Sequence, residues 1–309
     1  MSLEYVVNLL TTVLASGVRL TLPILVAALG EVYAERSGVL NLGIEGMMEF
    51  GAAIGFVTAY FYGSEYGLLA GALSGAFMGL LHAILSVRLR VNQVISGLTL
   101  ALLGEGLAIF TYRSFFKPGE APRVRGYPFI EIPLLSQIPI IGPALFDQSI
   151  LFYLTIVIVV IASIILFKTT IGLNIRAVGE NPRAAEALGI SVYGTRTACV
   201  IFGGLMAGLA GVFLSVGQMS MYYEGMVAGR GWIALAIVIF GRWSPHMVLL
   251  GSFLFGVVDA FQLRVQAEGW GIPHQFLLML PYIFTLVVFA CARKAVQPEA
   301  LGLPYKKGE

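Results

Sequence analysis

Two glutamates stand inside otherwise apolar stretches of this chain, and each is followed by glycine and methionine. Glu45 belongs to SGVLNLGIEGMMEFG at 37–51, and Glu224 belongs to YYEGMVAGRGW at 222–232. A carboxylate in hydrocarbon costs about 2.5–3.5 kcal/mol on insertion scales unless it faces water or a partner. Such a group is typical of a polar path through a membrane, although a carboxylate that stabilises a helix N-terminus is the structural alternative.

The glycines around Glu45 loosen any helix there and free backbone groups for hydrogen bonding. Free backbone groups at membrane depth are tolerated only beside a cavity or within packed protein. Residues 37–51 are therefore expected to form a broken helix next to a polar path. Three aromatic side chains near Glu224, those of Tyr222, Tyr223 and Trp232, are either faces for a bound solute or anchors at the membrane interface. The candidate path residues are Asn41, Glu45, Met47, Tyr223, Glu224 and Trp232.

Composition indicates which solvent surrounds these residues. The chain has 309 residues, of which 58% are hydrophobic and only 12% are charged, whereas soluble domains carry about 25% charged residues. A polytopic, all-α membrane protein is expected. The formal net charge of +2 gives no reason to expect a nucleic acid polymer as partner. Cys199 and Cys291 lie in apolar runs and the three histidines are scattered, so buried thiols are expected, and no metal or cofactor.

Hydropathy predicts about nine transmembrane helices, with eight to ten as the range. A span needs roughly 20 mostly apolar residues. Residues 3–17 are apolar but short, and are either an interfacial helix or part of a tilted first span. The predicted spans are 18–36, 40–62, 67–87, 92–112, 149–167, 197–216, 226–241, 246–264 and 275–292.

Basic residues predict the orientation, because cytoplasmic loops are enriched in Lys and Arg. Placing the C-terminus in the cytoplasm and the N-terminus outside puts most of the 19 basic residues inside. The predicted inner set is Arg36, Arg88, Arg90, Lys168, Arg176, Arg183, Arg196, Arg242, Arg293, Lys294, Lys306 and Lys307.

Two connections between the predicted spans are long. Residues 113–148 would lie outside and hold six prolines, so they cannot form a continuous helix and are a linker, a lid or a docking surface. Residues 168–196 would lie in the cytoplasm. There Asn181 is a suitable N-cap, Pro182 suits the first helical position and Gly189 is a natural stop. The expected helix of about two turns is too short to be stable without another surface.

The two halves of the chain resemble each other weakly. A shift of 179 residues places the Glu-Gly-Met at 45–47 on the one at 224–226, and similar shifts carry the first four spans onto the last four. The offset is five spans, so the halves would run oppositely through the membrane. This is the inverted repeat of transporters, whose sites form at the repeat interface. Glu45 and Glu224 would then occupy corresponding positions.

Small residues recur every four positions at Gly71, Gly75 and Gly79, and again at 203, 207 and 211. Such faces let helices approach closely. The polar residues His82, Glu105 and Asp259 are expected to be interhelical hydrogen-bond partners.

Two motifs resemble a known family. GLNIRAVGENPRAAEALGI at 172–190, followed by FGGLMAGLAG at 202–211, resembles the coupling region of ABC importer permeases of the ribose and branched-chain amino acid type. ERSGVLNLGIEGMM at 35–48 is similar to the nucleoside group of these permeases, which work with basic-membrane-protein-like lipoproteins. Glu49 departs from the apolar residue expected in that group.

The resemblance implies one permease domain over 1–309 with the type II importer fold, in a prokaryotic cytoplasmic membrane. Its parts would be a first repeat at 18–113, a linking span at 149–167, a cytoplasmic coupling segment at 168–196 and a second repeat at 197–292. It also implies four partners: an ATP-binding cassette subunit, a second permease that is a paralogue or a copy, an extracytoplasmic substrate-binding lipoprotein and membrane lipids. The implied ATPase-coupling residues are Gly179, Glu180, Asn181, Pro182, Arg183, Ala185, Glu186, Leu188 and Gly189.

A permease of this type is not an enzyme, and the chain has no G-x-x-x-x-G-K-[ST] loop with which to hydrolyse ATP itself. The expected function is a path for nucleosides or related small polar solutes, driven by a separate ATPase. The alternatives are a permease for simple sugars and an ion-coupled secondary transporter that uses Glu45 and Glu224. An intramembrane enzyme has little support, because no nucleophile motif or metal cluster is present.

Overall fold

The computed structural model describes residues 3–117, 119–269, 273–291 and 296–306, and most of them are helical. Two short helices, α6 (Thr170–Glu180) and α7 (Pro182–Ala187), connect α5 (Ile150–Lys168) to α8 (Val192–Val212). A two-stranded sheet, β1 (Phe129–Glu131) and β2 (Asp147–Ser149), follows α4 (Gln93–Phe115). The remaining helices are α1 (Leu3–Arg36), α2 (Ile44–Tyr62), α3 (Ser64–Ala83) with the π-helical η1 (Ile84–Arg88), α4 (Gln93–Phe115), η2 (Gly142–Phe146), α5 (Ile150–Lys168), α8 (Val192–Val212) with the π-helical η3 (Phe213–Met219), α9 (Arg230–Phe240), α10 (Pro245–Glu268) and α11 (His274–Cys291).

Helix lengths confirm a polytopic helical protein, do not confirm the predicted count of nine spans, and correct one of the predicted spans. Within the described ranges, six helices are long and apolar enough to cross a membrane. Residues 3–17 continue without a break into the first span, so they belong to α1 rather than to a separate interfacial helix. The predicted span at 226–241 is wrong. Only the 11 residues of α9 are helical there, and they cover about 16 Å of the roughly 30 Å of hydrocarbon.

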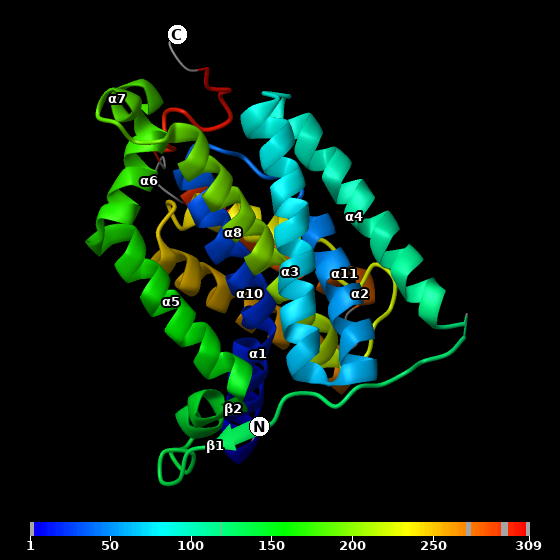
Figure 1. Ribbon diagram of the computed structural model, residues 1–309. Helices are drawn as coiled ribbons and strands as arrows, with labels where there is room; N and C mark the ends of the chain where they lie inside the picture. Colours follow the sequence, from blue (N-terminus) through cyan, green and yellow to red (C-terminus); the bar gives the residue numbers. More distant parts are fainter. Residues whose placement is uncertain (1–2, 118, 270–272, 292–295, 307–309) are drawn as a thin grey trace.

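Helices α1 and α8 form the centre of the molecule (Figure 1). Residues 21–35 of α1 are all buried, against α8, α9 and α10. Around this centre, α3 packs on α8 without side chains between the backbones. A Cβ on Gly75 would lie 2.2 Å from the Gly204 carbonyl oxygen and 2.6 Å from Gly208 Cα. Glycine is therefore required for this close crossing.

Both predicted small-residue faces lie at close helix crossings, and α8 has a further glycine row that was not predicted. Gly204 and Gly208 of this further row meet α3. Gly211 instead faces α2, where a Cβ would lie 2.0 Å from the Met48 carbonyl oxygen. One helix thus contacts two neighbours closely through two glycine rows, since consecutive rows are offset around the helix.

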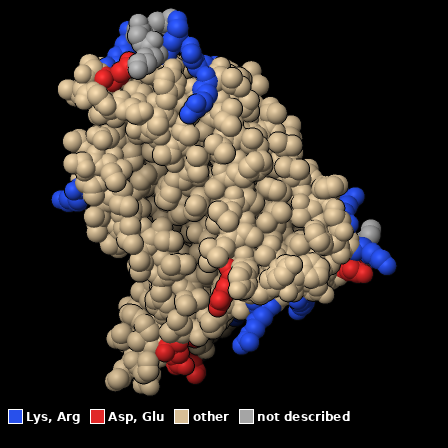
Figure 2. All heavy atoms as spheres, in the orientation of Figure 1, with Lys and Arg blue, Asp and Glu red and all other residues tan. Residues whose placement is uncertain are grey.

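The two ends of the molecule differ. The N-terminus and the β-hairpin lie at one end, named here the hairpin end, and α7 and the C-terminal residues lie at the other, named the α7 end (Figure 1). Charged residues gather near these ends, and a broad uncharged surface separates them (Figure 2). Large apolar side chains are exposed along the helices, among them Leu102 and Phe110 of α4, which are 72% and 70% exposed. Such a belt of exposed apolar side chains places the protein in a membrane. Of the basic residues predicted inside, Arg293, Lys294 and Lys307 lie outside the described residues.

The proline-rich connection is folded against the hairpin end. Its strands pair antiparallel with Phe129 opposite Ser149. Before them, the Val124 N–H donates to the Ser220 carbonyl (3.0 Å) and the Tyr127 hydroxyl donates to the Ser64 carbonyl (2.7 Å). The connection is therefore fixed to the helix ends it passes.

Candidate translocation site and coupling segment

Two carboxylates on α2 hold the short helix α9 in place. Glu45 and Glu49 are one turn apart, so they lie on the same face of α2. The Gly229 N–H donates to Glu45 Oε1 and the Gly231 N–H donates to Glu45 Oε2, both at 2.7 Å. Glu45 thus stabilises a helix N-terminus, as the structural alternative predicted, but the helix is α9 rather than its own.

Glu49 holds the irregular segment that precedes α9, residues 220–229. Its oxygens accept hydrogen bonds from the Tyr222 hydroxyl (2.9 Å), the Gly225 N–H (3.0 Å) and the Val227 N–H (3.1 Å). The Glu49 residue is only 3% exposed. Irregular backbone inside a membrane protein needs such partners, because lipid supplies none. The unexpected polarity of Glu49 therefore has a structural explanation.

Beside these two carboxylates lies a cavity of about 290 Å³ between α2, α4 and residues 225–232. Its polar and aromatic walls are Glu45, Glu49, Glu105 and Trp232. Glu105 is exposed, so its carboxylate is available to accept hydrogen bonds from a bound solute, whereas the oxygens of the two α2 carboxylates already accept backbone N–H groups. The indole of Trp232, a residue 40% exposed, offers a flat face on which a ring can stack.

Asn41 and Met47, predicted to line the path, do not reach this cavity. Both are fully buried, and the Asn41 backbone N–H and side-chain Nδ2 donate to the two carboxylate oxygens of Glu31, at 3.1 and 3.2 Å. Asn41 Nδ2 also lies 3.6 Å from Met47 Sδ, and Asn41 Oδ1 accepts the Gly43 N–H at 3.1 Å. Asn41 therefore fixes the turn between α1 and α2, since its backbone N–H and both polar atoms of its side chain serve that turn.

Glu224 and Tyr223 lie away from the cavity, which corrects the expected correspondence of Glu224 with Glu45. Glu224 is outside any helix and accepts two hydrogen bonds from Arg113, Nε at 2.7 Å and Nη2 at 2.8 Å. The hydrogen bond from Arg113 lowers the pKa of the Glu224 carboxyl below its ordinary value. Tyr223 is 46% exposed. Similar tripeptides thus serve different purposes, because one begins a buried helix and the other lies in a surface turn.

Two fully buried acidic residues of α1 were missed in the sequence. Glu31 holds Asn41, and Glu35 accepts a hydrogen bond from the indole N–H of Trp243. Their spacing of four residues was the available signal, since it places both on one helix face. The prediction for His82 is confirmed: its ring nitrogens lie 3.0 Å from Ser96 Oγ and 3.1 Å from the Leu40 carbonyl.

The coupling segment folds as the cap residues predicted, with one addition. Asn181 Oδ1 accepts the Ala184 N–H at 3.0 Å, Pro182 begins α7, and Gly189 has φ +84°, a value that favours glycine. Ala185 is buried, whereas Leu188 is 81% exposed at the tip. Helix α6 was not predicted, and α8 begins at 192 rather than 197.

Two further contacts fix the position of this segment. A Cβ on Gly179 would lie 2.0 Å from the Arg36 carbonyl oxygen, so the end of α6 lies directly against the end of α1. Glu186 accepts a hydrogen bond from the Tyr305 hydroxyl. Glu180 lies 4.0 Å from Arg36. The coupling segment is therefore supported on the protein's own helix ends, and its outer face stays free.

Membrane-spanning helices, a short helical connector supported on the helix ends and a polar cavity beside a short buried helix are together the features of a membrane permease. The chain belongs to the family described as branched-chain amino acid transport system, permease component, whose model matches residues 13–290.

Three relatives are similar over nearly their whole length. NupC of Lactococcus lactis, a nucleoside ABC transporter permease protein, is 37% identical over 98% of this chain and 99% of its own. NupQ of Bacillus subtilis, a guanosine ABC transporter permease protein, is 34% identical over 98% and 99%. TsgC13 of Haloferax volcanii, named provisionally as a glucose ABC transporter permease protein, is 39% identical over 91% of each chain. A further nucleoside permease protein of L. lactis, NupB, is 32% identical over 46% of this chain and 38% of its own.

Proposed function

We propose that this chain is the permease subunit of an ABC importer and forms part of the path for nucleosides, driven by a separate ATPase subunit. The full-length similarity to NupC and NupQ carries this proposal. The cavity supports it, because a nucleoside needs an aromatic face for its base and polar groups for its hydroxyls. Trp232 and Glu105 offer both in one place. A simple sugar is the second candidate, favoured by the similarity to TsgC13.

The chain would switch access as two oppositely oriented halves, 18–113 and 197–292, joined by a linking span at 149–167 and a coupling segment at 168–196. Reciprocal packing supports this arrangement: α3 packs on α8 as α10 packs on α1, and α2 packs on α8 as α9 packs on α1. Two similar halves related by a twofold axis produce such reciprocal contacts. The site would then form where the short α9 meets α2.

The α7 end would face the cytoplasm and receive the ATPase. The exposed tip of α7 at Leu188 is an apolar docking point, and the predicted inner basic residues Arg90, Arg183, Arg196 and Lys306 lie together at that end. Closure of the ATPase would press on residues 179–189, the coupling residues named above. Because α6 and α7 join α5 to α8, this movement would displace the second half against the first.

A second permease would cover the exposed face of α4. Glu105 is exposed on a helix that otherwise presents apolar side chains such as Leu102, a costly position toward lipid. A partner helix there would close the cavity from the remaining side. The existence of NupB beside NupC in one organism supports a paralogue as this partner. A substrate-binding lipoprotein would deliver the solute at the hairpin end.

Transport by the reconstituted system tests the proposal. The two permeases, the ATPase and the binding protein are placed in proteoliposomes, and uptake of labelled guanosine and uridine is measured with and without ATP. We expect ATP-dependent uptake that unlabelled nucleosides inhibit and glucose does not. Inhibition by glucose alone would favour the sugar permease, and uptake that needs an ion gradient but no ATP would refute an ABC importer.

A variant pair tests the cavity itself. Trp232→Ala removes the stacking face, which is worth about 1–3 kcal/mol per base in other proteins, so uptake is expected to fall about tenfold. Tyr223→Ala removes an aromatic ring of similar exposure outside the cavity and serves as control. An equal effect of both variants would exclude the cavity as the solute site.

A further inference from the structure

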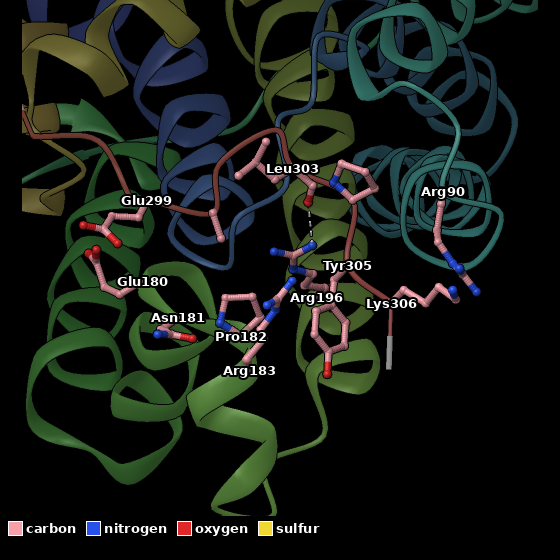
Figure 3. Close-up of a pocket in the computed structure, with 12 residues that line it drawn as sticks. Arg90, Glu180, Asn181, Pro182, Arg183, Arg196, Glu299, Leu303, Tyr305 and Lys306 are labelled. Carbon is pink, nitrogen blue, oxygen red and sulfur yellow. Dashed lines mark hydrogen bonds between the residues drawn. The ribbon is translucent and has the colours of Figure 1, made fainter. Parts of the chain in front are cut away.

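A polar groove lies at the α7 end between the coupling segment, the first turns of α8 and the C-terminal residues 296–306, named here the tail (Figure 3). Its volume is about 490 Å³, within the range of small-molecule sites. Four cationic side chains line it, Arg90, Arg183, Arg196 and Lys306, against two acidic ones, Glu180 and Glu299. The translocation cavity described above is separate and shares no lining residue with it.

The tail is a fixed wall of this groove. The Ala300 N–H donates to the Gly179 carbonyl at 2.9 Å, and the Gly302 N–H donates to the Gly38 carbonyl at 3.3 Å. Tyr305 is 7% exposed and packs with the buried side of α7. Backbone hydrogen bonds to two different segments hold the tail in one position, so the groove is a built site.

Arg196, at the centre of the groove, is a buried cation without a carboxylate partner. It is 2% exposed. Its Nε donates to the Ser37 carbonyl (3.1 Å) and its Nη1 donates to the Leu303 carbonyl (3.0 Å). Among the described residues, its Nη2 has no hydrogen-bond partner, and none of the ion pairs includes this arginine. Burying a charge without an opposite charge is costly, so an anion in the groove would be strongly favoured.

A second guanidinium enters the groove from the coupling segment. Arg183 lies on α7 and extends toward Arg196 in Figure 3, while Glu180 and Glu299 lie together at the other side of the view. The cations and the acids therefore occupy different parts of the groove. Two guanidinium groups that converge from different helices suit an oxyanion with several acceptor oxygens, because the Arg183 group offers paired donors and Arg196 Nη2 has donors that no protein group uses.

We propose that this groove binds a phosphate group between Arg183 and Arg196. The phosphate comes from a small soluble phosphate compound or from the headgroup of an anionic lipid. A phosphate held there bridges α7 to α8 and fixes the coupling segment against the tail. Occupancy of the groove would thus control how freely α7 responds to the ATPase. The site does not depend on which solute the permease carries.

Thermal unfolding of the full-length chain in phosphatidylcholine nanodiscs tests the site. Inorganic phosphate and adenosine monophosphate are titrated at constant ionic strength, with chloride as the reference salt. We expect a saturable rise in Tm with the phosphate compounds only. Arg183→Ala should weaken the apparent affinity about tenfold or more, because one charge-assisted contact is lost. Arg123→Ala, which removes an exposed arginine at the hairpin end, should leave the titration unchanged.

Further experiments distinguish a soluble phosphate compound from a lipid headgroup, and both of these from the ATPase subunit as the occupant of the groove. If a lipid headgroup fills the groove, phosphatidylglycerol nanodiscs raise Tm in an Arg183-dependent manner and soluble phosphate adds nothing. Arg196→Lys keeps the charge but removes the paired donors, and should also weaken binding; if it does not fold, Arg183→Ala decides. The proposal is overturned by the absence of any phosphate response in both lipids, or by an unchanged response in Arg183→Ala. It is also overturned if the ATPase subunit blocks phosphate binding and Arg183→Ala weakens assembly, because the groove is then a docking surface.

Discussion

Replacing Glu45 by glutamine tests whether a carboxylate of α2 holds the start of α9. In the native protein, both Glu45 oxygens accept backbone N–H groups, from Gly229 and Gly231 at 2.7 Å. Glutamine has nearly the same shape but only one acceptor oxygen. Its NH₂ group would face one of the two backbone donors, so that donor would lose its partner.

The size of the effect follows from these contacts. A hydrogen bond to a charged group contributes about 1.5–3 kcal/mol, and a negative charge at a helix N-terminus adds about 0.3–1 kcal/mol. Replacing the buried carboxylate by a neutral amide recovers part of the lost free energy, since the desolvation cost of the charge disappears. We expect a net loss of about 2 kcal/mol for the local structure, which corresponds to roughly 30-fold more frequent opening of the start of α9.

Hydrogen–deuterium exchange of residues 229–236 in nanodiscs measures this opening directly. Glu224→Gln is a matched control, because it makes the same chemical change at a carboxylate that is exposed and bound to Arg113 instead. We expect faster exchange in α9 for Glu45→Gln and an unchanged exchange rate there for Glu224→Gln. Unchanged exchange in Glu45→Gln, or equal changes in both variants, would refute the assigned role of Glu45.

Three further predictions concern other parts of the chain. Gly75→Ala should lower the free energy of unfolding by on the order of 1–3 kcal/mol, because the added Cβ meets the backbone of α8. The control Gly106→Ala places its Cβ in open space and should not lower Tm. Equal Tm values for the two variants would contradict the close α3–α8 crossing. Proline at position 189 cannot adopt φ +84° and loses the backbone hydrogen bond to the Glu186 carbonyl (2.8 Å). Gly189→Pro should therefore stop ATP-driven uptake but leave membrane insertion, measured by cell fractionation, unchanged. Uptake at the native rate would exclude the coupling role. The lowered pKa of Glu224 means that its pair with Arg113 contributes above about pH 4.5 and is lost as the pH falls further. Acid should therefore reduce the protection of residues 222–226, measured as the exchange rate relative to the intrinsic rate at the same pH, and an equal acid-induced loss of protection in Glu224→Gln would contradict this.

Apolar runs of about 20 residues predicted most of the helices, because lipid requires that length and composition. The same rule failed at 226–241. A short helix that is buried inside the protein has the same apolar composition as part of a span, so hydropathy alone does not reveal where the helix begins. The cap residues of α7 were predicted correctly, since Asn181, Pro182 and Gly189 act locally.

The candidate site was predicted only in part, because its contacts join distant segments. Glu45 and Trp232 do line one cavity. Asn41 looked equally suited to a path, but it lies in the turn between α1 and α2 and its partner Glu31 lies ten residues earlier on α1. Arg196 resembled an ordinary basic residue at the membrane boundary, and its burial depends on a tail more than 100 residues away. Such pairings depend on the tertiary fold, which no local pattern records.

The shortness of α9 has a consequence for biogenesis. A segment of 11 residues is too short for the insertion machinery to recognise as a span, and residues 220–229 before it have backbone donors that lipid cannot satisfy. Both depend on partners made earlier in the chain: Glu45 and Glu49 of α2 accept their backbone N–H groups, and α1 packs against α9. The segment between η3 and α10 must therefore enter the bilayer as a late step, after α2 has been threaded and can receive it. A newly made chain that stalls before this step would expose two unused glutamates, and quality-control proteases that survey the membrane would be expected to remove it.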